Sequence, residues 1–282
     1  MIGLQSQTPT AKPLKYLAYW YIYLPVLSVI GFAALVSFLA VYNTRVTEKS
    51  TSLYAFSDPS PTPFVIPNPQ TQKWLLSAGA VLSVRNHENY DTLGSNLPKD
   101  GVQILLYDSW GVSNRTEALD ILKQLKNQLH GRQFKALRKY LLAVTNNGDS
   151  EMYLKVKTDV MSGLYGQEPQ VQEFLVDFTW QHRNDLAEKN LLAWDYMRLI
   201  NVARWSYSLG FITENEAWED IDFAGRKLQQ NYTSWDDLGR SYILGRTFWL
   251  YSNSHPEIES AIAWLESHSS SPWKTIPWDL KL

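Results

Sequence analysis

The sequence contains no cysteine among its 282 residues. Disulfide bonds, thiolate nucleophiles and cysteine-ligated zinc or iron–sulfur sites are therefore excluded, whereas either redox compartment remains compatible with the chain. Histidine is also scarce: the five histidines are scattered, and no two of them stand four residues apart. Because this spacing is needed to hold a metal on one helix face, we expect no metal ion and no other cofactor.

Signature motifs of common enzymes are missing as well. The phosphate-binding GxxxxGK[ST] loop, the dinucleotide-binding GxGxxG turn and the GxSxG nucleophile motif do not occur. From residue 70 onward, 22 basic residues stand against 26 acidic ones. Such a faintly acidic domain lacks a phosphate-binding footprint, so nucleic acid is not an expected partner. No catalytic residue can be named from the sequence.

Charge is absent from residues 16–44. About 20 apolar residues suffice to cross a bilayer. Aromatic rings, which prefer the headgroup level, crowd the start of this run at Tyr16, Tyr19, Trp20 and Tyr21. Because the apolar core of a cleaved signal peptide spans only about 7–15 residues, we predict a single uncleaved transmembrane helix at 16–43 behind a tail of residues 1–15. A signal peptide and a buried core helix are the alternatives.

The orientation of this anchor depends on its flanking basic residues. Lys12 and Lys15 precede the uncharged run, and Arg45 and Lys49 follow it. Cytoplasmic flanks normally carry the excess of lysine and arginine. The two sides nearly balance here. We expect the amino terminus inside, which would export the rest of the chain.

Residues 44–69 are rich in proline, which stands at positions 59, 61, 63, 67 and 69. This spacing forbids a regular helix and favours an extended, semi-rigid spacer. A ligand for proline-binding domains is the alternative interpretation. The position of the segment directly behind the predicted anchor favours a tether.

Residues 70–282 show helical periodicity interrupted by short polar breaks, without a convincing run of strands. Asn68 can cap a helix that begins at Pro69, and Ser113 is expected to start an amphipathic helix that His130 and Gly131 end. Further helices are predicted at 132–144, 151–164 and 169–186.

The clearest helix signals follow. A helix over 191–209 is expected to end at Gly210, a residue suited to a left-handed cap. Thr213 and Glu216 form a capping box for the next helix, and Ser234 starts another that runs to about 252. A last helix is predicted from Pro256 to about 267. Connections of two to five residues imply antiparallel neighbours, so we predict an all-α, multi-helix globular domain.

Six short motifs carry a resemblance to a known family. They read Trp194-Asp195-Tyr196-Met197-Arg198, Ala203-Arg204-Trp205, Gly210-Phe211-Ile212, Glu216-Ala217-Trp218, Ser234-Trp235 and Gly245-Arg246-Thr247-Phe248-Trp249. Together they resemble the bacterial domain-of-unknown-function family 1266, over residues 70–268 and most strongly over 190–252. The resemblance implies an all-helical bacterial protein without an established activity or catalytic residues. The membrane would then be the bacterial inner membrane, with the domain on the periplasmic side, although a membrane helix is not a hallmark of the family.

The motif residues at the predicted helix 191–209 share one face. Trp194, Arg198, Asn201 and Trp205 follow the helical repeat, and Asp195 lies three residues before Arg198. An arginine between two tryptophans can stack on a ring while it pairs with a carboxylate. Asp195 is the nearest acceptor, and Asp220 or Asp222 of the next helix are the alternatives.

This stripe has two interpretations. A polar clasp between helices is favoured, because buried charges persist only when they are paired. The alternative is an anion-binding or peptide-binding pocket lined by Arg198, Arg204 and Arg246. The other motif residues are expected to be structural as caps or core aromatics; they are Gly210, Thr213, Glu216, Trp218, Ser234, Trp235, Gly245 and Trp249.

Three functions are compatible with these features. The preferred hypothesis is a membrane-anchored module that binds a protein partner, for instance as an immunity or accessory protein in interbacterial competition. The second is an unrecognised hydrolase or transferase acting on an anionic substrate near the membrane. The third is a structural scaffold. Acidic residues at 214–222 could bind a metal, but they are better explained as complements of a helix dipole.

Overall fold

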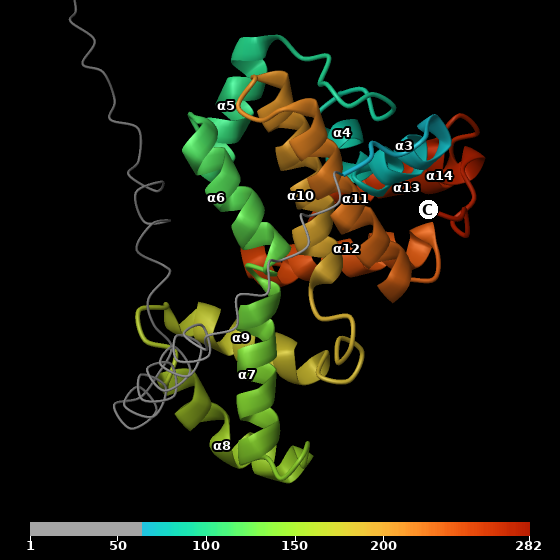
Figure 1. Cartoon of the computed structure of the whole chain (residues 1–282). Helices are drawn as coiled ribbons and strands as arrows, with labels where there is room; N and C mark the ends of the chain where they lie inside the picture. The colour runs from blue at the N-terminus through green and yellow to red at the C-terminus, as the bar shows by residue number, and fades with distance from the viewer. Residues whose placement is uncertain (1–63) are drawn as a thin grey trace, which may run out of the picture.

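The computed structural model of the chain describes residues 64–282, and the predicted tail, anchor and most of the linker lie outside these residues. The described part is folded from helices and contains no strand (Figure 1), so the predicted all-α globular domain is confirmed. Within residues 64–282, no helix combines the length and the apolar character that a bilayer crossing requires.

The helices of the first half are short, and a longer loop over residues 86–98 separates the second of them from the third. They are α3 (Pro69–Ala78), α4 (Ala80–Arg85), α5 (Lys99–Trp110), α6 (Arg115–Lys126), α7 (Gly131–Val144), α8 (Ser150–Ser162) and α9 (Pro169–Gln181). The first three helices of the second half are longer than those before them. They are α10 (Leu192–Ser208), α11 (Glu214–Asn231), α12 (Trp235–Leu250), α13 (Pro256–Ser267) and α14 (Pro272–Thr275).

Helix α10 is the centre of the fold. Fifteen of its 17 residues are buried, and it packs against α3, α4, α5, α6, α11 and α12. Figure 1 shows these helices arranged around it. A helix that is buried on all sides must satisfy any polar side chain internally, because water does not reach it. The polar motif residues of α10 are therefore decisive for the packing of its neighbours.

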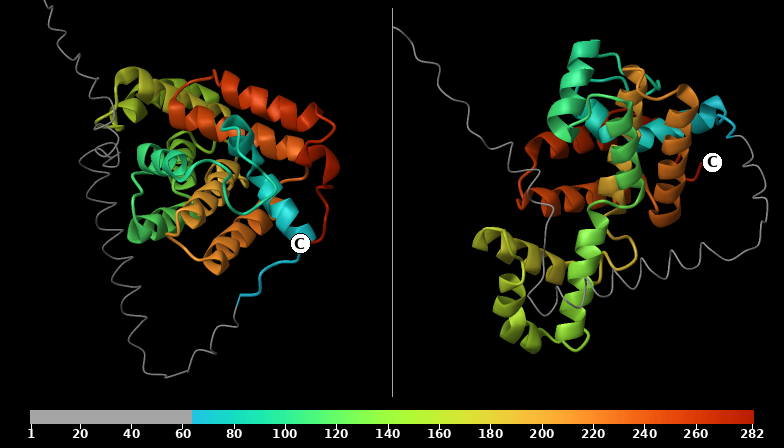
Figure 2. Two further views of the ribbon diagram at one scale, coloured as in Figure 1. Left: turned by 90° about the horizontal axis from the view of Figure 1, so that it is seen from above. Right: turned by 60° about the vertical axis from the view of Figure 1, so that its left-hand side comes forward.

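Helices α7, α8 and α9 form a lobe that projects from the helices around α10 (Figure 2). An aromatic cluster joins this lobe to α12. The ring of Phe248 lies 5.7 Å from that of Phe134 and 5.5 Å from that of Phe178. Aromatic pairs at such distances add to the free energy of area burial. The lobe is thus attached to the centre through apolar packing.

Several helix ends follow the sequence prediction. The side chain of Asn68 accepts hydrogen bonds from the N–H groups of the first turn of α3. Gly210 has a φ of +74°, in the left-handed region. The capping box of Thr213 and Glu216 is complete, and the hydroxyl of Ser234 accepts from the N–H of Asp237. These local signals are confirmed.

Other boundaries differ from the prediction. Asn114, rather than Ser113, caps α6, and the hydroxyl of Ser113 instead donates to Glu117. His130 and Gly131 begin α7 instead of ending a helix. The helix predicted over 169–186 ends at Gln181. The helices are separated by the segments 111–114, 127–130 and 182–191. Hydrophobic periodicity places such ends only to within a few residues.

The segment after Asn68 is also divided, because α3 and α4 meet at Gly79. A Cβ atom at this position would lie 2.6 Å from Cγ2 of Ile200. The chain therefore needs glycine here to approach α10. Helices α5 and α14 were not expected from the sequence pattern.

Four tryptophans gather where the carboxyl-terminal segment crosses α3. The ring of Trp235 lies 4.9 Å from Trp74, 5.7 Å from Trp273 and 4.8 Å from Trp278. Indole N–H groups of the cluster donate to backbone carbonyls: Trp74 to residue 278, and Trp273 to Ser77. The cluster packs α3, α12 and the carboxyl-terminal segment against one apolar core. Trp235 thus has the predicted core position.

Candidate functional site

A buried polar stripe runs along α10. It consists of Asp195, Arg198, Asn201 and Arg204, spaced by three residues. A spacing of three turns successive side chains gradually around the helix, so they reach different neighbours. Asp195 and Asn201 hydrogen-bond backbone groups where another helix begins or breaks, and Arg204 binds backbone carbonyls of the loop after α4. Such places leave N–H or C=O groups without intrahelical partners.

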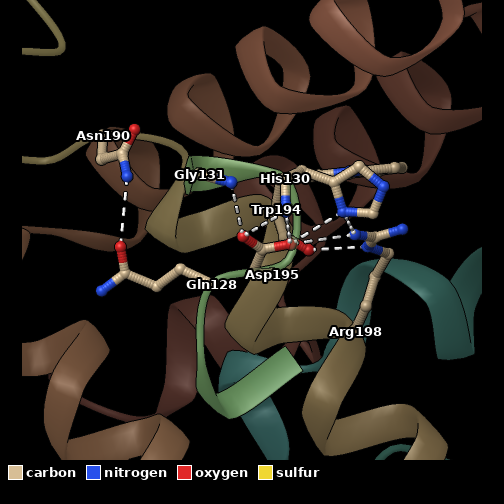
Figure 3. Close-up of polar contacts among 7 residues, drawn as sticks. All are labelled: Gln128, His130, Gly131, Asn190, Trp194, Asp195 and Arg198. Carbon is tan, nitrogen blue, oxygen red and sulfur yellow. Dashed lines mark hydrogen bonds and ion pairs between the residues drawn. The ribbon is translucent and has the colours of Figure 1, made fainter. Parts of the chain in front are cut away.

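Asp195 lies at the start of α7 (Figure 3). Its carboxylate accepts hydrogen bonds from the N–H of Gly131 at 2.9 Å and from the N–H of His130 at 3.2 Å. These groups have no partner in α7 itself, and the positive end of a helix dipole attracts an anion. Asp195 therefore caps a helix that lies more than sixty residues earlier in the chain.

Arg198 completes the ion pair. Its Nη2 lies 3.2 Å from Oδ1 of Asp195, and its Nε donates to the carbonyl of Trp194 at 2.8 Å. The guanidinium carbon lies 3.8 Å from the ring centroid of Trp194 and 5.0 Å from that of Trp110. Stacking between two rings lets a charged group remain buried. The arginine sits between two tryptophans as predicted, but the second ring is Trp110 of α5 and not Trp205.

His130 is the third member of this cluster. Its Nδ1 lies 2.8 Å from Nη2 of Arg198 and 3.0 Å from Oδ1 of Asp195. Burial, followed by the positive charge of Arg198, lowers the pKa of His130 below its ordinary value. The imidazole is therefore neutral at pH 7, and in the tautomer with its proton on Nε2 the Nδ1 atom accepts from the guanidinium.

Asn201 and Arg204 secure the segments around α4. The amide of Asn201 donates to the carbonyl of Gly79 at 2.8 Å, at the break between α3 and α4. The guanidinium of Arg204 donates to Ser83 Oγ at 2.6 Å and to the carbonyl of Asn89 at 2.7 Å. A third bond of 3.3 Å reaches the carbonyl of Leu93. Arg204 thus fills the inside of the loop between α4 and α5.

Trp205 holds the same loop through a different group. Its indole N–H lies 3.0 Å and 3.1 Å from the two carboxylate oxygens of Glu88. The carboxylate also accepts from the side chains of Ser95 at 2.6 Å and Asn86 at 3.1 Å. These donors compensate for the burial of Glu88. The loop is therefore anchored on α10 by two adjacent motif residues.

The three arginines of the predicted pocket have separate partners. Arg198 binds Asp195, Arg204 binds the loop before α5, and Arg246 pairs with Glu257 at the start of α13. The predicted alternative acceptors are also engaged elsewhere. Asp220 pairs with Lys126, and Asp222 pairs with Arg226 at 2.7 Å. The geometry corresponds to a clasp at Asp195 and Arg198 rather than to one pocket of arginines.

Gly245 and Trp249, two further motif residues, lie at the contact of α12 with α10. Gly245 faces Trp194 so closely that a Cβ atom would lie 2.1 Å from Cβ of the tryptophan. The rings of Trp249 and Trp194 are 5.5 Å apart. Trp218 is buried in α11. These positions suit core residues, because each packs against an apolar neighbour or lies within the core.

A groove of about 740 Å³ lies between the loop after α4 and helix α13. Its lining includes Arg85, His87, Tyr90, Glu257 and Trp264. The ring centroids of Tyr90, from the loop, and Trp264, from α13, lie 6.0 Å apart. His87 has a φ of +58°, in the left-handed region that histidine adopts more readily than most residues other than glycine. Motif residues Arg204 and Trp205 position this loop from inside.

The chemistry available to the buried cluster is limited. Asp195 has an exposed fraction of 0% and Arg198 of 5%, so a substrate cannot reach the carboxylate in this structure. Among the described residues, no three side chains of metal-binding type gather into a cluster. The groove, by contrast, is open to solvent and combines rings with charged groups, as binding sites do.

Sequence reasoning did not identify three residues of these sites, namely His130, Trp110 and Glu88. His130 stood at a helix break, and Trp110 and Glu88 lie far from α10 in the sequence. A buried arginine needs a carboxylate and ring contacts, so an arginine in an apolar helix indicates that such partners exist. The sequence does not indicate which segment supplies them, because the pairing is tertiary.

Comparison with known proteins gives one family. A search of curated proteins and of solved structures gives no match to the chain. A family described as proteins of unknown function, DUF1266, matches residues 105–278, which is more than half of the chain. The match begins later than the predicted residue 70, within α5, and extends past 268 to include Trp273 and Trp278. The chain therefore belongs to the DUF1266 family, as the motifs of α10, α11 and α12 predicted.

Proposed function

We propose that this chain is a membrane-tethered module of a bacterial cell that binds a segment of a protein partner in the groove between the loop after α4 and helix α13. The uncharged residues 16–44 supply the tether, and the proline-rich residues 44–69 hold the domain away from the bilayer. The domain then presents a binding surface beside the membrane, on the periplasmic side in the expected orientation.

Two buried residues of the family motif support this proposal, because they hold one wall of the groove. Arg204 and Trp205 are buried in α10, yet their hydrogen bonds end on the loop that forms one wall of the groove. A binding site needs walls that are held rigidly before the ligand arrives, because ordering them on binding costs affinity. The motif thus supports recognition without contacting the partner.

The groove also has the composition of a protein-recognition site. Tyr90 and Trp264 offer large rings whose ordering costs little conformational entropy. Arg85 and Glu257 provide opposite charges beside the rings, which can fix the direction of a bound segment. An enzyme acting on an anionic substrate has less support, because the carboxylate of Asp195 has no exposed surface.

The test compares two positions on the exposed side of α13. Ser260 lines the groove, whereas Ala263 is exposed on the same helix and does not line it. A photo-crosslinking residue is placed at 260 or at 263 in the full chain, and native membranes are irradiated. We expect a discrete adduct with one protein from position 260 and none from 263.

A substitution that fills the groove provides the second arm. Ser260→Trp should remove the adduct formed by a crosslinker at Tyr90 on the opposite wall, and Ala263→Trp should preserve it. Thermal unfolding of both variants confirms that the domain is intact. Identical crosslinking from 260 and 263, or an adduct insensitive to Ser260→Trp, would exclude the groove as the site.

A further inference from the structure

Helix α7 carries an unusual distribution of charge. Its 14 residues include Arg132, Lys135, Arg138 and Lys139, and no acidic residue. The chain from residue 70 onward is acidic overall, with 22 basic against 26 acidic residues. The basic side chains of α7 therefore concentrate positive charge on one helix of an otherwise faintly acidic domain.

The fold separates these side chains into two groups. Arg138 faces the segment that follows α9, where its Nε donates to the carbonyl of Arg183. Arg132, Lys135 and Lys139 are exposed, and their spacing of three and four residues puts them on one face. Phe134, Leu137 and Leu141 occupy the buried face. The helix is thus amphipathic, with a basic outer side.

Within the described part of the chain, no carboxylate forms an ion pair with these three exposed side chains. The ion pairs found within residues 64–282 involve other basic side chains, and none includes Arg132, Lys135 or Lys139. Tyr140 lies next to them with an exposed fraction of 52%. Tyrosine rings prefer the headgroup level of a bilayer, and lysine and arginine line the polar side of helices that lie on membranes.

We infer that the outer face of α7, formed by Arg132, Lys135, Lys139 and Tyr140, lies on an anionic phospholipid surface. The inference rests on the tether of the proposed function, since a tethered domain experiences a high effective concentration of headgroups. Each lysine or arginine near an anionic bilayer strengthens binding about fivefold. Long flexible side chains suit headgroups, which are themselves mobile, better than a fixed acidic protein surface.

The absence of cysteine from the chain permits a direct measurement. Ala136 is exposed between the basic residues, and Ala136→Cys can carry an environment-sensitive fluorophore. The full chain is reconstituted in vesicles of phosphatidylcholine alone or with phosphatidylglycerol. We expect the emission to shift to the blue only with phosphatidylglycerol, and the shift to disappear at high salt because screening weakens surface electrostatics. Lys227→Cys, exposed on α11, should show no shift.

Charge reversal tests whether these basic residues cause the shift. The triple variant Arg132→Glu, Lys135→Glu and Lys139→Glu should weaken the association on the order of a hundredfold or more. The matched control reverses three exposed lysines elsewhere, at positions 227, 274 and 281, and should retain the shift. Circular dichroism verifies the helix content of both.

The other possible outcomes of these measurements also test the α7 surface. A missing shift in phosphatidylglycerol, or a shift of equal size in the two triple variants, would overturn the inference. A shift that requires an added protein would assign the face to an acidic protein partner instead. A chain that leaves the vesicles in an alkaline wash lacks the tether, which contradicts the proposed function; retention of the phosphatidylglycerol-dependent shift before that wash would still uphold the α7 surface.

Discussion

The carboxylate of Asp195 accepts a hydrogen bond of 2.9 Å from the N–H of Gly131, so a side chain in the first turn of α10 caps the first turn of α7. His130, the residue before Gly131, provides no side-chain cap of its own. The cap is therefore supplied across the fold. It joins the projecting lobe to the central helix through the same carboxylate that pairs with Arg198.

Replacement of Asp195 by asparagine should destabilise the domain strongly. The change leaves Arg198 buried without its carboxylate and weakens the cap of α7, and breaking a buried pair costs about 3–5 kcal/mol. Urea unfolding should show a lower midpoint with little change in slope. Asp236→Asn is the control, because its pair with Arg240 is exposed and should contribute below about 1 kcal/mol. Equal losses in the two variants would contradict the clasp.

The stability of the domain should fall as the pH is lowered through the range of histidine. The pKa of His130 is depressed in the folded state, so below about pH 6.5 the unfolded chain binds a proton that the folded chain excludes. His130→Asn keeps an acceptor for Arg198 and removes this titration. Its free energy of unfolding should depend less on pH between 7 and 5 than that of the wild type. An unchanged slope would show that His130 does not titrate in this way; His268→Gln, at an exposed position, is the control.

Two glycine substitutions should have opposite effects. In Gly245→Ala, the new Cβ would overlap Trp194 at 2.1 Å, so α12 must move away from α10; overpacking of this kind costs about 1–3 kcal/mol. In Gly101→Ala, the nearest atom is 3.9 Å away, and alanine should stabilise α5 by about 0.5–1 kcal/mol. Thermal melting of both variants provides the measurement. A stabilised Gly245→Ala variant would refute the close approach of the two helices.

The capping box of α11 should fail in acid. A hydrogen bond from Arg115, with one from the backbone of Thr213, lowers the pKa of Glu216 to about 2. A depressed carboxyl pKa stabilises the folded state above the unfolded value, and this contribution is lost as pH falls toward 2. Glu216→Gln should therefore be less stable than the wild type at pH 7, and the two curves should converge between about pH 4.5 and 2. Curves that stay parallel to pH 2 would contradict this role, and Glu219→Gln serves as the exposed control.

Much of the fold was accessible from local sequence signals. Asn68, Ser234 and the box of Thr213 with Glu216 are confirmed as helix starts, because a cap involves residues only two or three positions apart. The break at Gly79 was not accessible. It depends on the approach of Ile200, which is distant in the chain.

In the candidate site, too, local sequence signals indicate some contacts and only the packing of distant segments decides others. The spacing of Asp195 and Arg198 indicated a pair on one helix, and the structure has it at 3.2 Å. The second ring beside Arg198 was assigned to Trp205 and proved to be Trp110. The periodicity of one helix places side chains on a face, but the segment opposite that face follows from packing.

The sequence by itself determined the helical class, most caps, the family motifs and the uncharged run at residues 16–44, because each depends on neighbouring residues. The tertiary structure alone decided that Arg198, Arg204 and Arg246 serve three different contacts. It also decided that the groove forms where the loop after α4 meets α13. Buried charges take whichever partner the packing of distant helices brings within reach, and that partner is not encoded in local spacing.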